Sequence, residues 1–161
     1  MEENRTPETE QHLFDNYEYQ LIQASSGKRF LNYIIDVLSF SVFSYLLSYV
    51  LVAISYDLAV LIYGDGETFN LVGQLIILLL YGMYMGLIES IFKGRSLGKL
   101  ITGTVAVNED GTHISGHTAL LRGLCRAVPF NAFSALGNPS YPWHDKWTKS
   151  YVVDIKSLNR E

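Results

Sequence analysis

Residues 28–56 read KRFLNYIIDVLSFSVFSYLLSYVLVAISY, an apolar stretch that follows two cations. At about 1.5 Å per residue, residues 30–56 would form a helix of roughly 40 Å. A bilayer has a hydrocarbon core about 30 Å thick, which such a helix can cross. The stretch therefore predicts a membrane-spanning helix. Asp36 is the one charged residue between Phe30 and Tyr56.

The environment of Asp36 decides how the rest of the chain is arranged. An ionised carboxylate at the centre of a lipid-exposed helix costs about 2.5–3.5 kcal/mol, so it requires a partner. In one interpretation Asp36 pairs with Arg29, Arg122 or Arg126 and fixes the helices in one arrangement. In the other it is a proton or cation site that changes protonation during transport. The sequence leaves both open.

A second apolar stretch, residues 71–92, would form a helix of about 33 Å that can also span a membrane. Gly82, Gly86 and Ser90 recur at four-residue spacing in it. Small residues at this spacing let helices approach closely, so we expect this face to pack against the first helix. The intervening residues 57–70 contain acidic residues and no cation, and we expect a loop.

The distribution of charge predicts the orientation. None of the 12 Lys and Arg residues lies between Phe30 and Phe92. The positive-inside rule then places both termini in the cytoplasm. The N-terminus is acidic and polar, unlike a secretory signal, so we expect the first span to remain as an anchor. A net charge of −4 and the lack of a basic, aromatic-interleaved patch give no argument for nucleic acid.

The C-terminal half has the composition of a small sheet and an interfacial helix. Residues 102–107 and 112–114 flank a turn and predict a β-hairpin, to which residues 150–155 could add a third strand. Residues 117–136 suggest an amphipathic helix at the inner interface, interrupted by Arg122 and Arg126. Whether residues 117–137 lie at the interface or re-enter the membrane stays open.

A row of serines on the first helix also has two interpretations. Ser41, Ser44, Ser48 and Ser55 form a polar stripe above Asp36. The stripe favours close helix packing, with a solvated pathway as the alternative.

Residues 94–99 (GRSLGK) differ from a phosphate-binding loop in the spacing of the glycines and in Leu100, which stands where Ser or Thr would bind magnesium. We expect a cationic turn at the headgroups instead. His113, His117, His144 and Cys125 are the candidate metal ligands, but a strand-to-helix boundary separates His113 from His117, so these two do not share a helical face and we expect no metal site. No nucleophile with an activating base and no cofactor loop emerges, and we expect no enzyme and no cofactor. The remaining candidate is a charge network that could form an ion or proton site: Arg29, Asp36, Glu89, Arg122, Arg126 and Asp145.

An ordered set of short motifs covers almost the whole chain except the tail: Arg29 with Asp36, residues 94–99, residues 103–107, Leu121-Arg122 with Arg126, and His144-Asp145-Lys146 before Tyr151-Val152-Val153. Over residues 24–155 this set resembles the RDD family of small bacterial integral membrane proteins. The arginine and two aspartates that name the family would be Arg29, Asp36 and Asp145. The resemblance implies a place in the bacterial inner membrane and a role in transport, since some similar proteins are credited with sodium–proton antiport.

We therefore expect an α-helical membrane protein with two transmembrane helices, a cytoplasmic β-hairpin or three-stranded sheet, and an amphipathic interfacial helix. Residues 1–23 would be a polar acidic tail, 24–155 the membrane domain and 156–161 a C-terminal tail. The expected function is transport, with cation/proton exchange through the Asp–Arg network as the candidate reaction. The alternative is a non-catalytic scaffold or assembly factor that binds partner proteins at its cytoplasmic face. The expected partners are the bilayer, further copies of the chain or another membrane protein, and a monovalent cation or proton.

Overall fold

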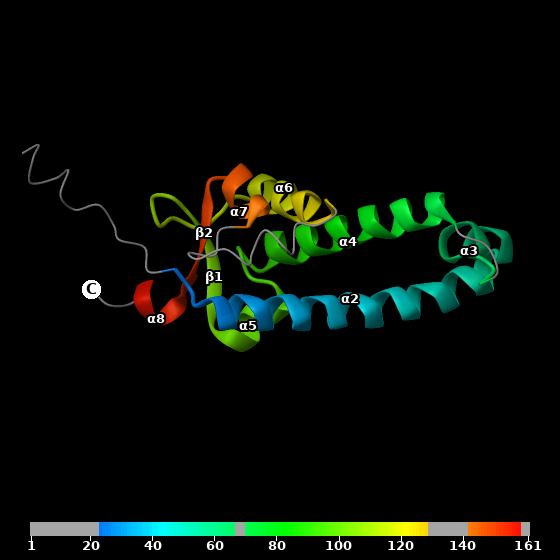
Figure 1. The fold of residues 1–161 in the computed structure, drawn as a ribbon, viewed down its shortest axis with the longest axis horizontal. Coiled ribbons are helices and arrows are strands. Elements are labelled where there is room, and N and C mark those ends of the chain that lie inside the picture. Colours follow the sequence, from blue (N-terminus) through cyan, green and yellow to red (C-terminus); the bar gives the residue numbers. More distant parts are fainter. Residues whose placement is uncertain (1–22, 67–69, 129–141, 159–161) are drawn as a thin grey trace, which may run out of the picture.

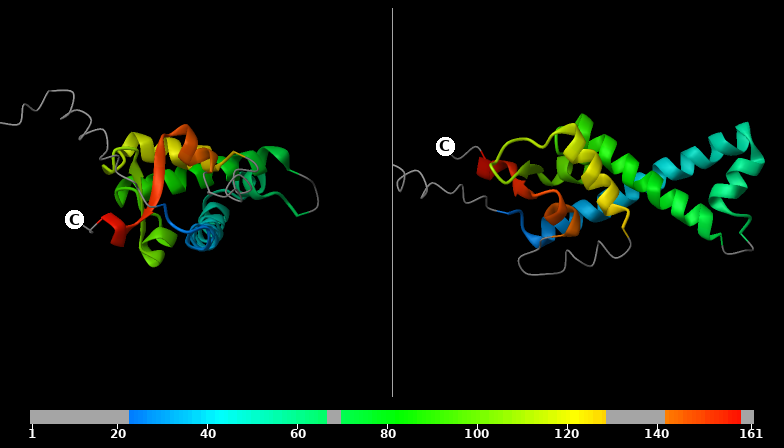
Figure 2. Two further views of the ribbon diagram at one scale, coloured as in Figure 1. Left: turned by 60° about the vertical axis from the view of Figure 1, so that its left-hand side comes forward. Right: turned by 90° about the horizontal axis from the view of Figure 1, so that it is seen from above.

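The computed structural model describes residues 23–66, 70–128 and 142–158. Two long helices lie between a small sheet at one end and a short connecting helix at the other (Figure 1), and they cross when seen from above (Figure 2). The elements in chain order are α2 (Ser26–Ile54), α3 (Tyr56–Tyr63), α4 (Leu71–Ile91), α5 (Leu97–Thr102), β1 (Thr104–Asn108), α6 (Gly116–Arg126), α7 (Trp143–Trp147), β2 (Ser150–Asp154) and α8 (Ile155–Leu158).

Both long helices begin after a polar residue that caps them. The Ser25 hydroxyl accepts a hydrogen bond from the Lys28 amide at the start of α2, and Asn70 caps α4 by accepting from the Gly73 amide. α2 ends before Ser55, whose extended backbone breaks the helix. Both spans therefore match the expected helices to within a few residues.

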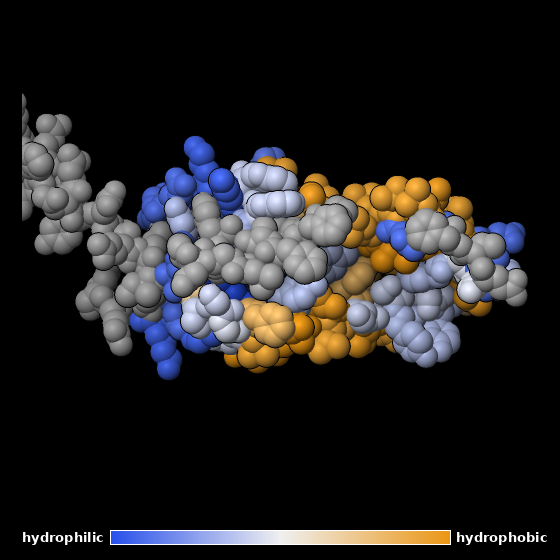
Figure 3. All heavy atoms as spheres, viewed as in Figure 1, coloured by the Kyte–Doolittle hydropathy of each residue, from blue (hydrophilic) through white to orange (hydrophobic). Residues whose placement is uncertain are grey.

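The surfaces of α2 and α4 are apolar over most of their length (Figure 3). Both helices are long and apolar enough to cross a membrane, with a mean hydropathy of 2.1 over the most apolar 18 residues of each. Large side chains such as Leu46, Ile54 and Leu79 are more than half exposed. In water this exposure would be unfavourable, whereas lipid tails solvate it.

The expected loop after the first span contains a helix. α3 begins at Tyr56 and is capped by Ser55, whose hydroxyl accepts from the Leu58 amide. The helix folds back toward the start of α4. The approach is close, since a Cβ on Gly73 would lie 2.2 Å from the Ile62 carbonyl oxygen. Ala59 is the one buried residue of α3, while Tyr56 and Leu61 are more than half exposed, so most of this short helix lies at the surface.

The sheet has two strands in the described residues, β1 and β2, which pair antiparallel with Ala106 opposite Val152. The expected three-stranded sheet is not confirmed. Residues 112–114 contribute a single bridge, between Val107 and His113, because Ser115 starts α6 immediately afterwards and leaves no length for a strand. The segment expected to be an additional strand, β2, is the main partner of β1.

Both outer edges of the sheet are partly occupied. The Ala24 amide donates to Val152 O at 2.8 Å, and the Ala106 amide donates to Gly94 O at 2.9 Å. These bonds fasten the start of α2 and the end of α4 to the sheet. The two spans are thereby joined at this end by β1 and β2.

α6 ends at Arg126, well before the expected boundary, and the remainder of that expected helix lies mostly outside the described residues. α6 packs antiparallel along the last turns of α4, with Gly116 beside Ser90 and Leu120 beside Gly86. Figure 2 shows α6 lying against the part of α4 nearer the sheet. An orientation flat on the interface is not confirmed.

The small-residue face of α4 packs against α6, so the expected packing against the first helix is wrong. A Cβ on Gly123 of α6 would lie 2.3 Å from the carbonyl oxygen of Gly82 and 2.3 Å from the amide nitrogen of Gly86. Glycines on both helices allow this approach. α2 lacks a matching glycine face, and its described contacts with α4 include aromatic pairs such as Phe43 with Tyr84.

Candidate functional site: a buried charge network

The six charged residues selected from the sequence come together beside the sheet, at the end where α2 starts and α4 ends. They lie on α2, α4, α6 and α7, and Lys99 on α5 joins them. Their side chains are at most 9% exposed. We use the term charge network for Arg29, Asp36, Glu89, Lys99, Arg122, Arg126 and Asp145.

Glu89 is the centre of the network. Its Oε1 accepts hydrogen bonds from Lys99 Nζ at 2.6 Å and from Arg126 Nη2. Its Oε2 accepts from Arg122 Nε at 3.0 Å. Three cations from two other helices therefore neutralise a carboxylate that is 1% exposed. Such multiple pairing offsets the large desolvation penalty of a buried charge.

Asp36 fastens α5 to the first span. Its Oδ2 accepts from the Ser96 hydroxyl at 2.7 Å, and its Oδ1 accepts from the Gly98 amide at 2.8 Å. Of the three arginines considered as partners, Arg126 is the one that pairs with it, with Nη1 at 3.6 Å from Oδ2. Gly98 permits the contact, since a Cβ there would lie 2.5 Å from the Asn32 carbonyl oxygen.

Arg29 and Asp145 link the first span to α7 and the sheet. Arg29 Nη1 donates to Asp145 Oδ2 at 2.9 Å, while its Nη2 donates to Val152 O at 3.1 Å. Arg122 Nη1 lies 2.8 Å from Asp145 Oδ1 and also donates to the Ser150 hydroxyl. The three residues that name the resemblance, Arg29, Asp36 and Asp145, therefore all take part in this network.

Lys99 is the network residue that the sequence analysis missed. We expected a cationic turn at the headgroups, but Lys99 is 2% exposed and donates to Gly94 O at 3.3 Å as well as to Glu89. Ser96 caps α5 by accepting from the Lys99 amide, which starts the helix that turns Lys99 inward. The sequence signal for a buried position was the pair of glycines around Lys99, Gly94 and Gly98. Both glycines allow this segment to approach other backbone segments closely, which an exposed turn does not require.

Burial and neighbouring charges shift the protonation equilibria around Glu89. Burial lowers the pKa of Lys99 from 10.5 to about 8, with Glu89 opposing the shift and Arg122 and Arg126 adding to it. Burial also lowers the pKa of His144 well below its usual range, so this imidazole is neutral at pH 7. The pKa of Asp145 falls to about 2: burial opposes ionisation, but the charges of Arg122 and Arg29 outweigh it.

The positive and negative charges of the network do not cancel. Its described members are four cations and three carboxylates, so one positive charge is unbalanced when all are ionised. The guanidinium groups do not deprotonate in proteins, so Lys99 is the described cation of the network whose charge depends on pH. No group of three His, Cys, Asp or Glu side chains in the described part of the chain is arranged to hold a metal ion.

Comparison with known families agrees with the resemblance drawn from the motifs. The sequence model of the RDD family matches residues 23–149, which is most of the chain and includes every member of the charge network. No curated protein and no solved structure matches the chain. The match to the family model confirms the assignment made from the motifs.

Proposed function

Because this chain belongs to the RDD family, we propose that it takes part in transport, as a cation/proton exchanger whose exchanging pair is Lys99 and Glu89. Family membership and the two apolar helices indicate a membrane protein. The proposed location is the bacterial inner membrane, with both termini in the cytoplasm. The observation that carries the exchange proposal is a buried lysine with a pKa of about 8 beside a carboxylate that two arginines also hold.

The exchange step follows from the atoms around Lys99. When the ammonium group loses its proton, its hydrogen bonds to Glu89 Oε1 and Gly94 O weaken. A carboxylate oxygen and a backbone carbonyl are ligands that a monovalent cation such as Na⁺ accepts. One H⁺ leaves as one cation arrives, so the charge of the network is unchanged and the step avoids the penalty of an additional buried charge.

Asp36 has a positioning role in this mechanism. Its carboxylate oxygens accept from Ser96 and Gly98, at the start of the helix that carries Lys99. Neutralising Asp36 would weaken these bonds and the pairing with Arg126, and would thus displace Lys99 from Glu89. The earlier interpretation, in which Asp36 itself exchanges a proton, is superseded by Lys99 in this proposal.

Two spans enclose little volume, so an exchanger built from this chain would require further copies or another membrane protein. We therefore include a homo-oligomer, or a complex with a partner membrane protein, in the proposal. The extensive apolar exposure of α2 and α4 leaves room for such neighbours beside lipid. Recovery of only monomers after crosslinking, in native membranes and in liposomes at every lipid ratio, would contradict the proposed assembly.

The test is ion-driven proton movement in liposomes that contain the purified protein. An internal pH dye is read after pulses of sodium, lithium or potassium. We expect a signal in the wild type that Lys99→Arg abolishes, because arginine keeps the positive charge but does not release its proton. Lys156→Arg, at an exposed position, is the matched control and should behave as wild type.

The interpretation of this test requires that the variants fold. Lys99→Arg protein that retains a cooperative unfolding transition yet shows full exchange would contradict the role of Lys99. Asp36→Asn should reduce the signal through displacement of α5. A flat trace from well-folded wild type would favour the second candidate.

That second candidate is a non-catalytic scaffold that binds partner proteins at the sheet end. It is favoured by an exposed aromatic pair on α7, Trp143 and Trp147, whose rings stack at 5.8 Å and which are 39% and 55% exposed. Exposed tryptophans are frequent anchors in protein interfaces. A protein crosslinked in native membranes and lost on Trp147→Ala would support this role, and its retention would contradict it.

A further inference from the structure

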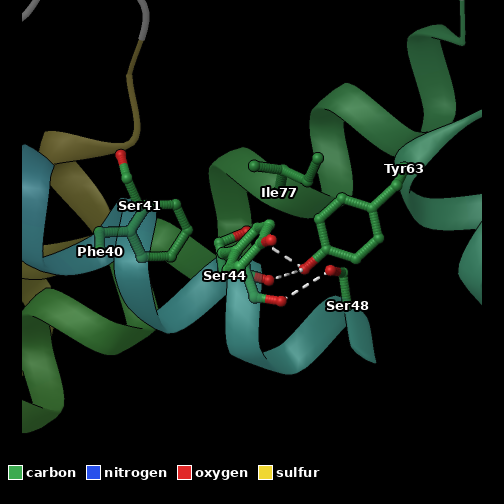
Figure 4. A pocket seen from close by; sticks show the side chains of 7 residues that line it. Phe40, Ser41, Ser44, Ser48, Tyr63 and Ile77 are labelled. Atoms are coloured by element: carbon green, nitrogen blue, oxygen red, sulfur yellow. Dashed lines mark hydrogen bonds between the residues drawn. The ribbon is translucent and has the colours of Figure 1, made fainter. Parts of the chain in front are cut away.

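A hollow of about 390 Å³ lies between α2, α3 and α4, in the half of the spans away from the charge network. Figure 4 shows Ser44 and Ser48 of α2 facing Tyr63 of α3 and Ile77 of α4 across it. Most of its lining residues carry hydroxyl groups: Ser41, Ser44, Tyr45, Ser48 and Tyr63. A hydroxyl-lined hollow at membrane depth is unusual, because lipid tails offer no hydrogen bonds.

Ser41, Ser44 and Ser48 of the serine stripe line this hollow, whereas Ser55 caps α3. Ser44 Oγ lies 3.1 Å from the Tyr63 hydroxyl, and Tyr63 also donates to the Ser44 carbonyl at 2.9 Å. Ser48 donates to the Tyr45 carbonyl, which leaves the lone pairs of its hydroxyl as acceptors. Polar groups within a membrane face protein or a water-filled space, and the volume of the hollow accommodates several waters.

We propose that this hollow is a water-filled vestibule that admits hydrated monovalent cations from the membrane face opposite the charge network. That water fills the hollow does not depend on the proposed function. That cations pass through the hollow during exchange rests on the function proposed above. The electron-rich ring faces of the tyrosines and Phe40 favour cations over anions, and the hydroxyl oxygens offer lone pairs as cation ligands.

The inner wall of the hollow approaches the network closely. Phe40 lines the hollow and lies one turn from Asp36, about 6 Å along the helix axis. Its ring packs edge-on against Tyr81 at 5.1 Å. Tyr84 donates to the Ser39 hydroxyl at 3.3 Å, and Ser39 donates to the Asp36 carbonyl at 2.8 Å. Phe40 therefore marks the end of the hollow nearest the network, whereas the hydroxyls of Tyr84 and Ser39 lie outside its lining and lead to the backbone carbonyl of Asp36.

The test is thiol labelling of the full-length protein in liposomes, in a Cys125→Ala background. Cysteine at Ser44 is reacted with charged, membrane-impermeant thiosulfonates, one carrying trimethylammonium and the other sulfonate. Leu46→Cys is the matched control, since Leu46 is 60% exposed on the lipid-facing surface of the same helix turn. Asp57→Cys marks water on the same side of the membrane, and Lys156→Cys marks the opposite side.

We expect Ser44→Cys to react at least tenfold faster than Leu46→Cys, and only from the side on which Asp57→Cys reacts. The ratio of cationic to anionic labelling should be several times higher at Ser44 than at Asp57. Ser48→Phe, which fills the hollow, should slow the labelling of Ser44→Cys. Equal rates at Ser44 and Leu46, or preferential anionic labelling at Ser44, would overturn the vestibule.

The same protein separates this proposal from the function on which it depends. If Ser44→Cys is labelled as expected and the wild type shows no exchange, the vestibule stands and the exchange function fails. If the wild type exchanges cations and full labelling leaves the rate unchanged, the exchange function stands and the vestibule is not on its route. Inhibition in proportion to labelling supports both.

Discussion

Glu89 at the end of the second span and Lys99 on α5 are ten residues apart in the chain and 2.6 Å apart between Oε1 and Nζ. The intervening turn brings them together, with Gly94 O bound to the Ala106 amide and Ser96 bound to Asp36. This ion pair connects the membrane-spanning part of the chain to the sheet. Three of the following predictions concern the charge network and its immediate neighbour His144.

The protonation of Lys99 should make stability depend on pH in the alkaline range. Its folded pKa of about 8 lies below the unfolded value of 10.5, so the unfolded chain binds more protons between these values. The free energy of unfolding should therefore rise from pH 8 to pH 10.5, by up to about 3 kcal/mol. The measurement is the thermal midpoint in detergent, followed by tryptophan fluorescence. In Lys99→Arg this rise should be absent, and an identical profile would contradict the shift.

Removing the Asp36 side chain should destabilise the fold. Asp36→Ala leaves the Gly98 amide and the Ser96 hydroxyl without their acceptor and removes one partner of Arg126. We expect a loss of roughly 3–5 kcal/mol in unfolding free energy, as for other broken buried pairs. Asp36→Asn keeps an acceptor for Gly98 and should lose less. An unchanged midpoint in Asp36→Ala would indicate that water hydrates this carboxylate.

The packing of α6 on α4 should be intolerant of a single methyl group. Gly123→Ala places a Cβ within 2.3 Å of backbone atoms of Gly82 and Gly86, so α6 must shift away from α4. We expect destabilisation of about 1–3 kcal/mol, the usual range for overpacking. Gly27→Ala is the matched control, because nothing lies within 4 Å of its added Cβ, and the change should stabilise α2 by up to about 1 kcal/mol. Equal midpoints for the two variants would refute the close contact.

Acid should weaken the fold through His144. The pKa of His144 in the folded chain lies well below its usual 6.5. As the pH falls below 6.5, this imidazole is therefore protonated in the unfolded chain and stays neutral in the folded chain. The unfolding free energy should fall by up to about 1.4 kcal/mol for each pH unit in this range. Midpoints measured from pH 7 to pH 5 should show a shallower fall in His144→Gln than in the wild type. An unchanged slope would assign the acid sensitivity to other groups.

Much of the local structure was predictable from the sequence. The bounds of both spans follow from the lengths of the apolar runs and from Ser25 and Asn70, which cap the helices. The membership of Arg29, Asp36, Glu89, Arg122, Arg126 and Asp145 in one network follows from charges that apolar surroundings force to pair. The helix α3 was missed because a short apolar run between turn residues does not reveal its own conformation.

The sequence by itself determined which segments are apolar, where helices start, and that the charges near Asp36 need partners. Only the tertiary structure decided which charge meets which. The choice of α6 over α2 as the neighbour of Gly86, the inward turn of Lys99 and the pairing of β1 with β2 depend on contacts between distant residues. Periodicity reports what each segment must bury. The identity of the surface that buries it depends on shape and on close approach, which a one-dimensional pattern does not contain.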